Sequence, residues 1–362
     1  MEGSLEDLRR QVDQVDSEIL EAINRRARLV QEIGRTKAER GAPVYQPARE
    51  AEVVGRAIAA NAGPLSDSGV AEIFSRIMVE GRSLEKSLRV AFLGPEHTFS
   101  HQAAKQVFGG GAEYLATSSI DEIFVKTEGA VADFGVVPVE NTTAGTVGDT
   151  LDRFVETTSR IVGEVTLPIA HSLLSRQNPQ AIRVVYSHPQ ALSQCQKWLN
   201  QNLHWAERVE VASTAAAAAR AATEEGSAAV GPAAGAEANG LRVVHSNIQD
   251  FSGNSTRFFV IGRTPNEETG RDKSAMIFAV LDRVGALHDV LGILRHHAIN
   301  LCNIQTRPAK GRVALESGDY LFFAEFWGHH LQPEVAAAVE EIRSLCTLVK
   351  MLGSWPARAT SD

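Results

Sequence analysis

The stretch from Leu5 to Arg40 constrains the fold most, because it carries helical periodicity and contains no proline. Its apolar residues recur mostly every three or four positions, so that one helix face carries Leu8, Val12, Val15, Ile19, Ile23, Val30 and Ile33. At about 1.5 Å per residue, such a helix extends about 54 Å, which is longer than most globular helices. We therefore expect a partner to cover this helix.

The next part of the chain predicts two further helices. Pro43 and Pro47 end the first periodic stretch, the periodicity resumes over residues 49–61, and Gly63-Pro64 separates it from a third helical stretch at residues 66–86. Residues 1–87 are therefore predicted to form an all-α domain.

Short apolar runs alternate with helical stretches after Arg89. The runs at residues 89–93, 135–137, 182–186 and 209–211 each precede a loop and a helix, which predicts a parallel α/β sheet within a domain at 88–265. A polar linker covers residues 263–272. The segment 273–355 then shows the order strand, helix, strand, strand, helix, strand, which is the ferredoxin-like βαββαβ pattern.

Composition excludes several classes of protein. Asp and Glu outnumber Lys and Arg by 44 to 36, and a net charge of −8 argues against a general nucleic-acid binder. Cys195, Cys302 and Cys346 are far apart and show no zinc or disulfide spacing, which fits a reducing compartment. No apolar run reaches the ~20 residues that cross a bilayer. We expect a cytoplasmic protein without nucleic-acid or membrane partners.

Six charged residues of the helical segment are candidates for a site: Arg9, Arg26, Lys37, Arg49, Glu50 and Glu85. Arg26 and Lys37 are eleven positions apart, close to three helical turns, so they share a face, whereas Arg9 points elsewhere. These charges fit an ordinary solvated surface. The alternative is a small pocket in which arginine forks clamp a dianion.

The same positions, within the motifs Leu8-Arg9, Gly34-Arg35-Thr36-Lys37 and Arg49-Glu50, resemble the all-helical chorismate mutase family over residues 5–87. The resemblance implies two intertwined chains, with Arg9 reaching the site of the other protomer. It implies rearrangement of chorismate to prephenate, with substrate bound by Arg26, Arg49 and Glu50. Lys37 and a protonated Glu85 would donate hydrogen bonds to the breaking ether oxygen. Mutase activity should then fall as Glu85 loses its proton at higher pH.

Four places in the central segment are predicted as helix N-termini with hydroxyl or amide groups. They contain Thr98 and Ser100, then Asn141, then Ser187, and finally Ser213 and Thr214. Such residues are ordinary N-caps. Helix N-termini after parallel strands also meet at one sheet edge, where they attract anions. Because the chain has no GxGxxG motif and no P-loop, a nucleotide is not indicated.

Residues 89–262 resemble the prephenate dehydratase family. The motifs are 94–100 (GPEHTFS), 138–142 (PVENT), 187–190 (SHPQ) with Gln194, and 254–258 (NSTRF), where Thr-Arg-Phe is the family hallmark. The resemblance implies two α/β lobes around a cleft, as in periplasmic binding proteins, and conversion of prephenate to phenylpyruvate. Thr256 would assist departure of the ring hydroxyl, whereas Glu140, Asn141, Ser187 and Gln194 would orient substrate. Arg257 would clamp a carboxylate or brace its loop, and His97 stands where the family usually has glycine.

The last segment resembles the ACT regulatory domain that follows such dehydratases. Residues 285–288 (Gly285, Ala286, Leu287, His288) match its ligand loop, whereas residues 305–308 match its usual Glu-Ser-Arg-Pro only at Arg307 and Pro308. The resemblance implies L-phenylalanine as a feedback effector, with Asn300 and the loop amides holding its polar groups. A domain that serves packing alone remains an alternative. The histidine pairs 296–297 and 329–330 lack acidic or cysteine partners at metal-ligand spacing.

These observations predict a bifunctional chorismate mutase/prephenate dehydratase that binds L-phenylalanine and forms at least a homodimer. Neither reaction needs a cofactor or a metal, and none is predicted. One alternative keeps the dehydratase but treats the helical domain as a degenerate dimerisation module. Another is a non-catalytic amino-acid sensor, in which the Thr-Arg-Phe triplet would have no reason to be intact.

Overall fold

The structure is a computed structural model that describes residues 4–40, 43–280, 283–308 and 320–357. These residues divide into two compact units, each described here by itself. The first unit contains the chain up to Leu88 together with Phe108–Glu113, and the second contains Arg89–Val107 and Tyr114–Ala357. The ranges predicted as a second and a third domain thus fall within one compact unit.

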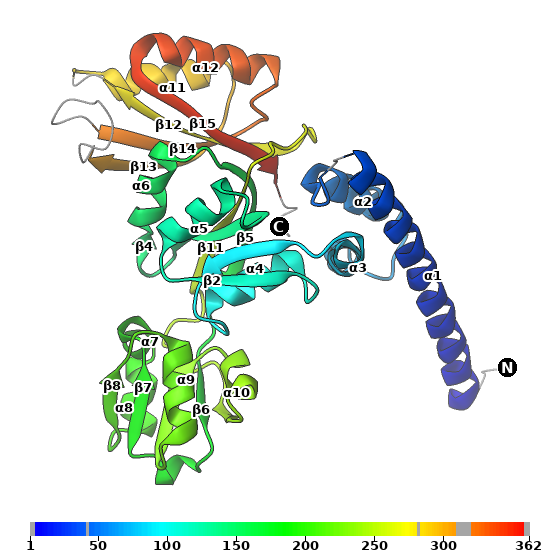
Figure 1. Ribbon diagram of the computed structural model, residues 1–362, viewed down its shortest axis with the longest axis vertical. Helices are drawn as coiled ribbons and strands as arrows, with labels where there is room; N and C mark the ends of the chain where they lie inside the picture. Colours follow the sequence, from blue (N-terminus) through cyan, green and yellow to red (C-terminus); the bar gives the residue numbers. More distant parts are fainter. Residues whose placement is uncertain (1–3, 41–42, 281–282, 309–319, 358–362) are drawn as a thin grey trace. The chain divides into compact units, whose positions relative to one another are not determined.

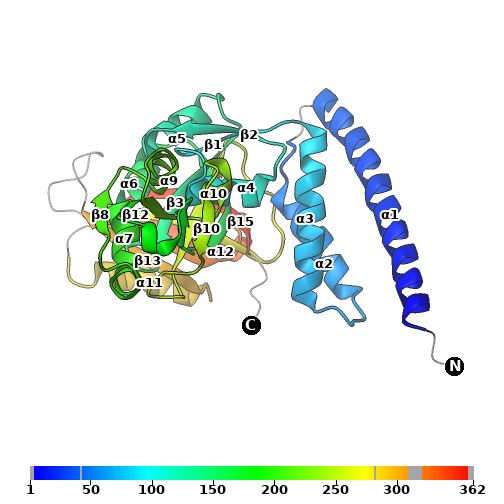
Figure 2. The ribbon, with the colours of Figure 1, turned by 90° about the horizontal axis from the view of Figure 1, so that it is seen from below.

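Three helices form the first unit, as the periodicity predicted: α1 (Leu5–Arg40), α2 (Pro47–Ala59) and α3 (Asp67–Glu85). Helix α3 contacts both α1 and α2, and Figure 2 shows α3 running beside α1. Ser66 caps α3 by accepting a hydrogen bond from the Gly69 amide. Gly34 is the one buried residue of α1.

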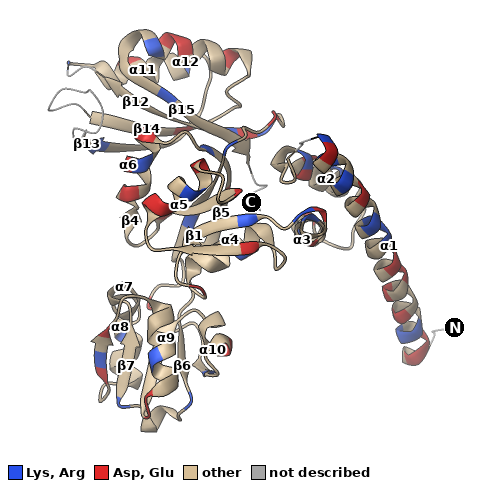
Figure 3. Ribbon diagram, viewed as in Figure 1, with Lys and Arg blue, Asp and Glu red and all other residues tan. Residues whose placement is uncertain are grey.

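The apolar face of α1 is largely uncovered in the single chain. Its exposed apolar residues have 36–64% of their surface accessible, and they are Leu5, Leu8, Val12, Val15, Ile19, Leu20, Ile23, Leu29 and Ile33. Charged residues occupy the helix along its whole length (Figure 3). An apolar face of this extent marks an interaction surface.

The second unit begins with a lobe built on a six-stranded sheet of order β2-β1-β3-β11-β5, with β4 beside β3. Its strands are β1 (Arg89–Leu93), β2 (Glu113–Thr117), β3 (Phe134–Asn141), β4 (Gly145–Thr146), β5 (Arg160–Pro168) and β11 (Ser255–Gly262). Its helices are α4 (Phe99–Phe108), α5 (Ile120–Glu128) and α6 (Gly148–Glu156).

A second lobe is built on a five-stranded sheet of order β10-β6-β9-β7-β8 (Figure 1). Its strands are β6 (Ser172–Ser175), β7 (Val184–Ser187), β8 (Glu207–Glu210), β9 (Ser227–Gly231) and β10 (Arg242–His245). Its helical elements are η1 (Pro179–Ala181), α7 (Pro189–Gln194), α8 (Gln196–Asn202), α9 (Thr214–Thr223) and α10 (Ala234–Ala238). The chain passes between the lobes twice, at residues 169–171 and 246–254.

A parallel sheet was predicted, but both sheets of the two lobes are mixed. Strands β1 and β3 are parallel, but β11 runs antiparallel to both β3 and β5. In the second lobe β7 is parallel to β8 and β9, whereas β6 is antiparallel to β9 and β10. The strand–helix repeats revealed only the parallel pairs, because β5 and β11 lead into and out of the second lobe and are not followed by crossover helices.

The C-terminal segment has the predicted βαββαβ order. It comprises β12 (Asp272–Val280), α11 (Ala286–His296), β13 (Leu301–Pro308), β14 (Tyr320–Trp327), α12 (Pro333–Leu345) and β15 (Cys346–Pro356), with antiparallel sheet order β13-β14-β12-β15. One sheet face packs on α11 and α12. The other face shares a core with the first lobe, in which Phe154 and Phe259 cluster with Phe323 and Trp355. Among the described residues, no helix combines the length and apolarity needed to cross a membrane.

Candidate active sites

A close approach of two helices brings together the predicted catalytic residues of the first unit. A Cβ placed on Gly34 would lie 2.8 Å from the Cα of Glu85, so only glycine lets α1 and α3 come so near. Lys37 follows Gly34 by nearly one turn. Its Nζ lies 2.9 Å from Glu85 Oε2 in a largely buried ion pair, and it also reaches the Val44 carbonyl at 3.4 Å.

Glu50 lies close enough to Lys37 and Glu85 for their charges to act on it, and it makes an ion pair that the sequence did not predict. The Nε of Arg82, a residue only 4% exposed, lies 2.9 Å from Glu50 Oε1. Burial raises the pKa of Glu50, and the charges of Arg82 and Lys37 oppose that rise. Protonation of Glu50 is therefore easier than for an exposed glutamate.

Arg26 borders this cluster, whereas Arg9 and Arg49 do not join it within one chain. A Cβ on Gly81, one turn before Glu85, would lie 3.3 Å from Arg26 Nη1. Arg49 is exposed and bonds to Glu52, and Arg9 is exposed as well. Because Arg9 precedes Lys37 by 28 residues on α1, the two lie about 42 Å apart along the axis.

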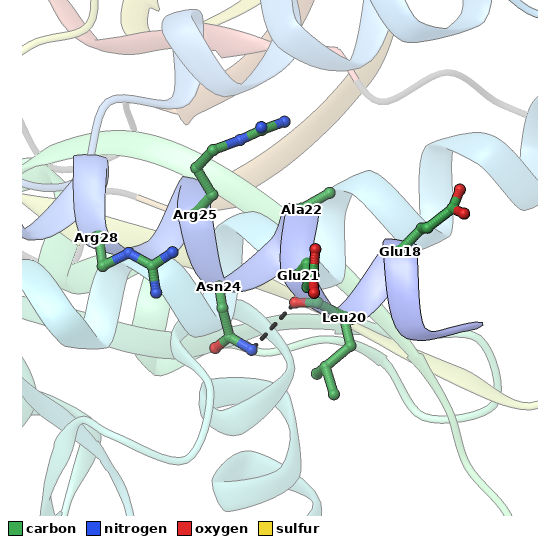
Figure 4. Close-up of a pocket in the computed structure, with 7 residues that line it drawn as sticks. All are labelled: Glu18, Leu20, Glu21, Ala22, Asn24, Arg25 and Arg28. Carbon is green, nitrogen blue, oxygen red and sulfur yellow. Dashed lines mark hydrogen bonds between the residues drawn. The ribbon is translucent and has the colours of Figure 1, made fainter. Parts of the chain in front are cut away.

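A surface concavity on α1 is separate from this cluster. All the residues that line it come from that one helix, and they are Glu18, Leu20, Glu21, Ala22, Asn24, Arg25 and Arg28 (Figure 4). Its one drawn hydrogen bond runs from Asn24 Nδ2 to the Leu20 carbonyl. Of these residues only Leu20 belongs to the exposed apolar face, and the others are mostly polar or charged.

In the second unit, pairing of β3 with β11 places Asn141 opposite Thr256. Asn141 Nδ2 donates to Thr256 Oγ1 at 2.8 Å and to Asn254 Oδ1 at 3.1 Å. Its Oδ1 accepts from the backbone amides of Thr143 and Ala144. The prediction that Asn141 lies at a helix N-terminus was therefore wrong. This residue ends β3, and a hairpin to β4 follows because Gly145 turns the chain at φ +80°.

Arg257 binds carboxylates of the protein itself. Both of its terminal nitrogens lie 2.6 Å from Glu325, a residue of β14 that is only 1% exposed. Glu164 and Glu140 each lie 3.3 Å away. Burial would lower the pKa of Arg257, but Glu325 and the other two carboxylates raise it. Of the two roles open from sequence, this geometry favours the brace over a free carboxylate clamp.

The motif at residues 94–100 forms the turn into α4. Thr98 donates its hydroxyl to the Pro95 carbonyl at 2.9 Å, and Ser100 is half-buried in the first turn of the helix. His97 adopts a left-handed φ of +64°, and its amide donates to His101 Nδ1 at 2.9 Å. The backbone thus keeps a conformation that glycine adopts more readily.

The second lobe gives its predicted site residues different surroundings. Ser187 is fully buried and donates to the Val230 carbonyl, and Ser213 caps α9 by accepting from the Ala216 amide. Thr214 is the first residue of that helix. Gln194 Oε1 lies 2.8 Å from Nε2 of the buried His171.

The residues predicted to bind the effector lie in two different places, at the start of α11 and in or just before β13. Gly285 has φ +81° and precedes α11, whose first residues are the buried Ala286, the half-buried Leu287 and the exposed His288. The Asn300 carbonyl accepts from the Trp327 amide. Arg307 instead extends from β13 to Asp152 of α6, with Nη2 3.1 Å from Oδ1. Its guanidinium therefore links the C-terminal sheet to the first lobe.

Comparisons with known proteins agree with this arrangement. The type II chorismate mutase family matches residues 8–86, and the prephenate dehydratase family matches residues 90–266. Bifunctional chorismate mutase/prephenate dehydratases from Aquifex aeolicus (39% identical over 97% of this chain and 98% of that one) and Pseudomonas aeruginosa (40%, 98% and 98%) are similar throughout. The chain belongs to the bifunctional chorismate mutase/prephenate dehydratase family. A solved Arthrobacter aurescens prephenate dehydratase in complex with L-Phe is 30% identical, with a TM-score of 0.68 over 76% of this chain and 91% of that one.

Sequence reasoning missed several buried residues that contact the predicted site residues of this bifunctional enzyme. In the mutase domain, Arg82 also lies over the ring of Tyr45, with Cζ 4.5 Å from the ring centre. The sequence indicated Arg82 only as a single arginine among the apolar and small residues on the buried face of α3. In the dehydratase domain, His171 and Asn254 are 2% and 3% exposed and contact the predicted site residues. Within the described ranges, no group of His, Cys, Asp and Glu is arranged to hold a metal ion.

Proposed function

We propose that this enzyme rearranges chorismate to prephenate in its helical unit and converts prephenate to phenylpyruvate in its α/β unit. Membership of the bifunctional family supports both activities. At residue level, the hydrogen bond between Asn141 and Thr256 carries the dehydratase proposal. One assay tests the whole sequence of reactions: purified protein receives chorismate, and prephenate and phenylpyruvate are followed in time.

The mutase step needs donors that stabilise negative charge on the ether oxygen as its bond breaks. We propose that Lys37 is one donor and that Glu85, after taking up a proton, is the other. Their 2.9 Å contact supports a shared position at one site. Glu85→Gln keeps a donor at every pH, so the alkaline fall in mutase rate should disappear. An unchanged pH profile would reject Glu85 as the donor.

A second chain completes the mutase site in this proposal. Two observations support it: the exposed apolar face of α1, and the position of Arg9 about 42 Å from Lys37 on one helix. If each site takes Lys37 from one chain and Arg9 from the other, mixed dimers of Arg9→Ala and Lys37→Ala chains contain one intact site. Unfolding and refolding the two inactive variants together should then restore mutase activity, and no recovery would refute the shared site.

The dehydratase step needs a proton donor near the departing hydroxyl. Thr256 Oγ1 accepts from Asn141, which leaves its own O–H free to donate toward substrate. We propose that Glu140, Gln194 and the α4 turn orient the substrate around it. Thr256→Val keeps the β-branched shape but removes the hydroxyl, and should lower dehydratase turnover by about 10²–10⁴-fold. Prephenate would accumulate from chorismate, whereas Thr256→Ser should retain activity; near-normal turnover of the valine variant contradicts this role.

We also propose that the C-terminal βαββαβ segment is an ACT domain that binds L-phenylalanine as a feedback effector. The L-Phe named in the Arthrobacter aurescens structure supports this effector. Gly285, Ala286, Leu287, His288 and Asn300 are the proposed contacts. Arg307 is already bound to Asp152, so its part is to hold the sheet against the first lobe. Calorimetric titration with L-phenylalanine tests the proposal, and an absence of binding heat and inhibition rejects it.

A further inference from the structure

The side-chain amide of Asn254 has an orientation that its neighbours determine. Asn141 Oδ1 accepts from two backbone amides, so its Nδ2 must be the group that faces Asn254. The facing atom of Asn254 must then be the acceptor, Oδ1, at 3.1 Å. The hydroxyls of Thr142 and Thr143 each lie 3.1 Å from the same oxygen. Three donors therefore converge on Oδ1 of Asn254.

This orientation leaves the Nδ2 of Asn254 without a partner. Asn254 is 3% exposed, and its Nδ2 is buried and makes no hydrogen bond in the structure. An unsatisfied buried donor is costly, and native proteins retain few of them without a reason. Asn254 ends the second connection between the lobes and precedes the start of β11, where Thr256 lies. The unpaired donor is thus a close neighbour of the proposed reacting centre.

We propose that Asn254 Nδ2 donates a hydrogen bond to an oxygen of the dehydratase substrate. This inference rests on the proposed dehydratase function. If Asn254 served only to hold Asn141 in place, as a brace, the oxygen of its side-chain amide would suffice, because all three hydrogen-bond partners of Asn254 are donors. The Nδ2 group of Asn254 can instead donate a hydrogen bond to a carboxylate or to the departing hydroxyl of the substrate. A carboxylate contact acts mainly on KM, whereas a contact with the departing hydroxyl acts on kcat.

The substitution Asn254→Asp separates the brace from the substrate contact. A carboxylate keeps the acceptor for three donors, so thermal unfolding of the whole chain should be unchanged, but the Nδ2 donor is lost. We expect dehydratase kcat/KM with prephenate to fall about 10–100-fold, the range for losing a hydrogen bond to a charged group. Mutase activity of the same chain should stay at the wild-type value.

Two further variants complete the experiment. Ser255→Asp places a charge at the adjacent, half-buried position and controls for electrostatic repulsion; it should retain most dehydratase activity. If Asn254→Asp fails to fold, Asn254→Ser, which also lacks Nδ2, carries the test with the same expected loss, provided that its melting temperature equals that of wild type and the brace is therefore intact. Dehydratase activity within threefold of wild type in the folded Asn254 variant, or an equal loss in Ser255→Asp, would overturn the inference. A wild-type chain without dehydratase activity would instead refute the proposed function.

Discussion

Substituting Gly34 by alanine should damage mutase catalysis more than it damages stability. The new Cβ would lie 2.8 Å from Glu85 Cα, 3.0 Å from Glu85 Cβ and 3.1 Å from the Glu85 carbonyl oxygen. Carbon atoms in favourable contact are about 3.5–4.0 Å apart. Because two of the three atoms are backbone, a rotamer change cannot relieve the overlap, and α1 and α3 must separate by about 1 Å.

The two consequences differ in size. Overpacking costs about 1–3 kcal/mol, and the better helix propensity of alanine offsets up to about 1 kcal/mol of it. A shift of about 1 Å in a catalytic group can cost about 10²-fold in rate. Since Lys37 and Glu85 sit on the helices that move apart, we expect mutase kcat/KM to fall about 10²-fold. The net loss of stability should stay below about 2 kcal/mol.

The enzyme provides its own controls for this experiment. Mutase activity is followed by the loss of chorismate, and dehydratase activity is measured separately with added prephenate, which reports on the other unit of the same chain. Gly55→Ala is the matched substitution, because no atom lies within 4 Å of a Cβ at that position of α2. It should leave mutase activity unchanged. Mutase activity of Gly34→Ala within threefold of wild type would refute the steric argument.

Three further predictions concern the ion pair between Arg257 and Glu325, the stability of the protein in acid, and its assembly into dimers. Glu325→Gln keeps one acceptor oxygen for Arg257 but removes the negative charge, so the carboxylates left to Arg257 are Glu140 and Glu164 at 3.3 Å. The change should cost about 2–3 kcal/mol of unfolding free energy, below the ~3–5 kcal/mol for removing one partner of a buried ion pair outright. A denaturant midpoint equal to wild type contradicts this. Burial, aided by the charge of Lys105, lowers the pKa of His101 from 6.5 to about 4. As the pH drops, the unfolded chain therefore takes up this proton before the folded chain does. The free energy of unfolding should then fall between pH 6.5 and pH 4. His101→Gln should therefore show a shallower acid loss of melting temperature, and parallel curves would contradict that cause. Ile19→Lys on the exposed face of α1 should halve the mass measured by light scattering, whereas an unchanged mass argues against that face as the interface.

Local patterns predicted the elements better than their partners. The bounds of α1 and β1 match the ranges predicted from periodicity, and the βαββαβ order of the last segment follows from its strand and helix patterns. The antiparallel course of β11 was not predictable in this way, because it depends on where the chain returns from the second lobe. Spacing along one helix likewise places Arg26 and Lys37 on one face. It says nothing about Glu85, which lies 48 positions from Lys37 in sequence.

Residues that link the predicted site residues to distant segments were not predicted from the sequence for the same reason. Glu325 lies in a segment predicted as a separate domain, yet it contacts Arg257 of the dehydratase hallmark at 2.6 Å. Asn254 belonged to a quoted motif, but only the flanking hydrogen bonds show which half of its amide is unused. Gly34 offered a local signal. A glycine inside a long helix weakens it by about 1 kcal/mol, so its presence indicates a close approach by another segment.

The charges of the dehydratase site bear on how a dianion is held. Arg257 is the one cation among the residues predicted to bind prephenate, and three carboxylates surround it. Its charge is therefore largely neutralised by the protein before any substrate arrives. In the proposed site, the neutral donors Thr256 and Asn254 then provide much of the binding, because a hydrogen bond is stronger where water is excluded. A chain with a net charge of −8 thus need not place a free arginine at this site, provided that its amide and hydroxyl groups are held in fixed orientations.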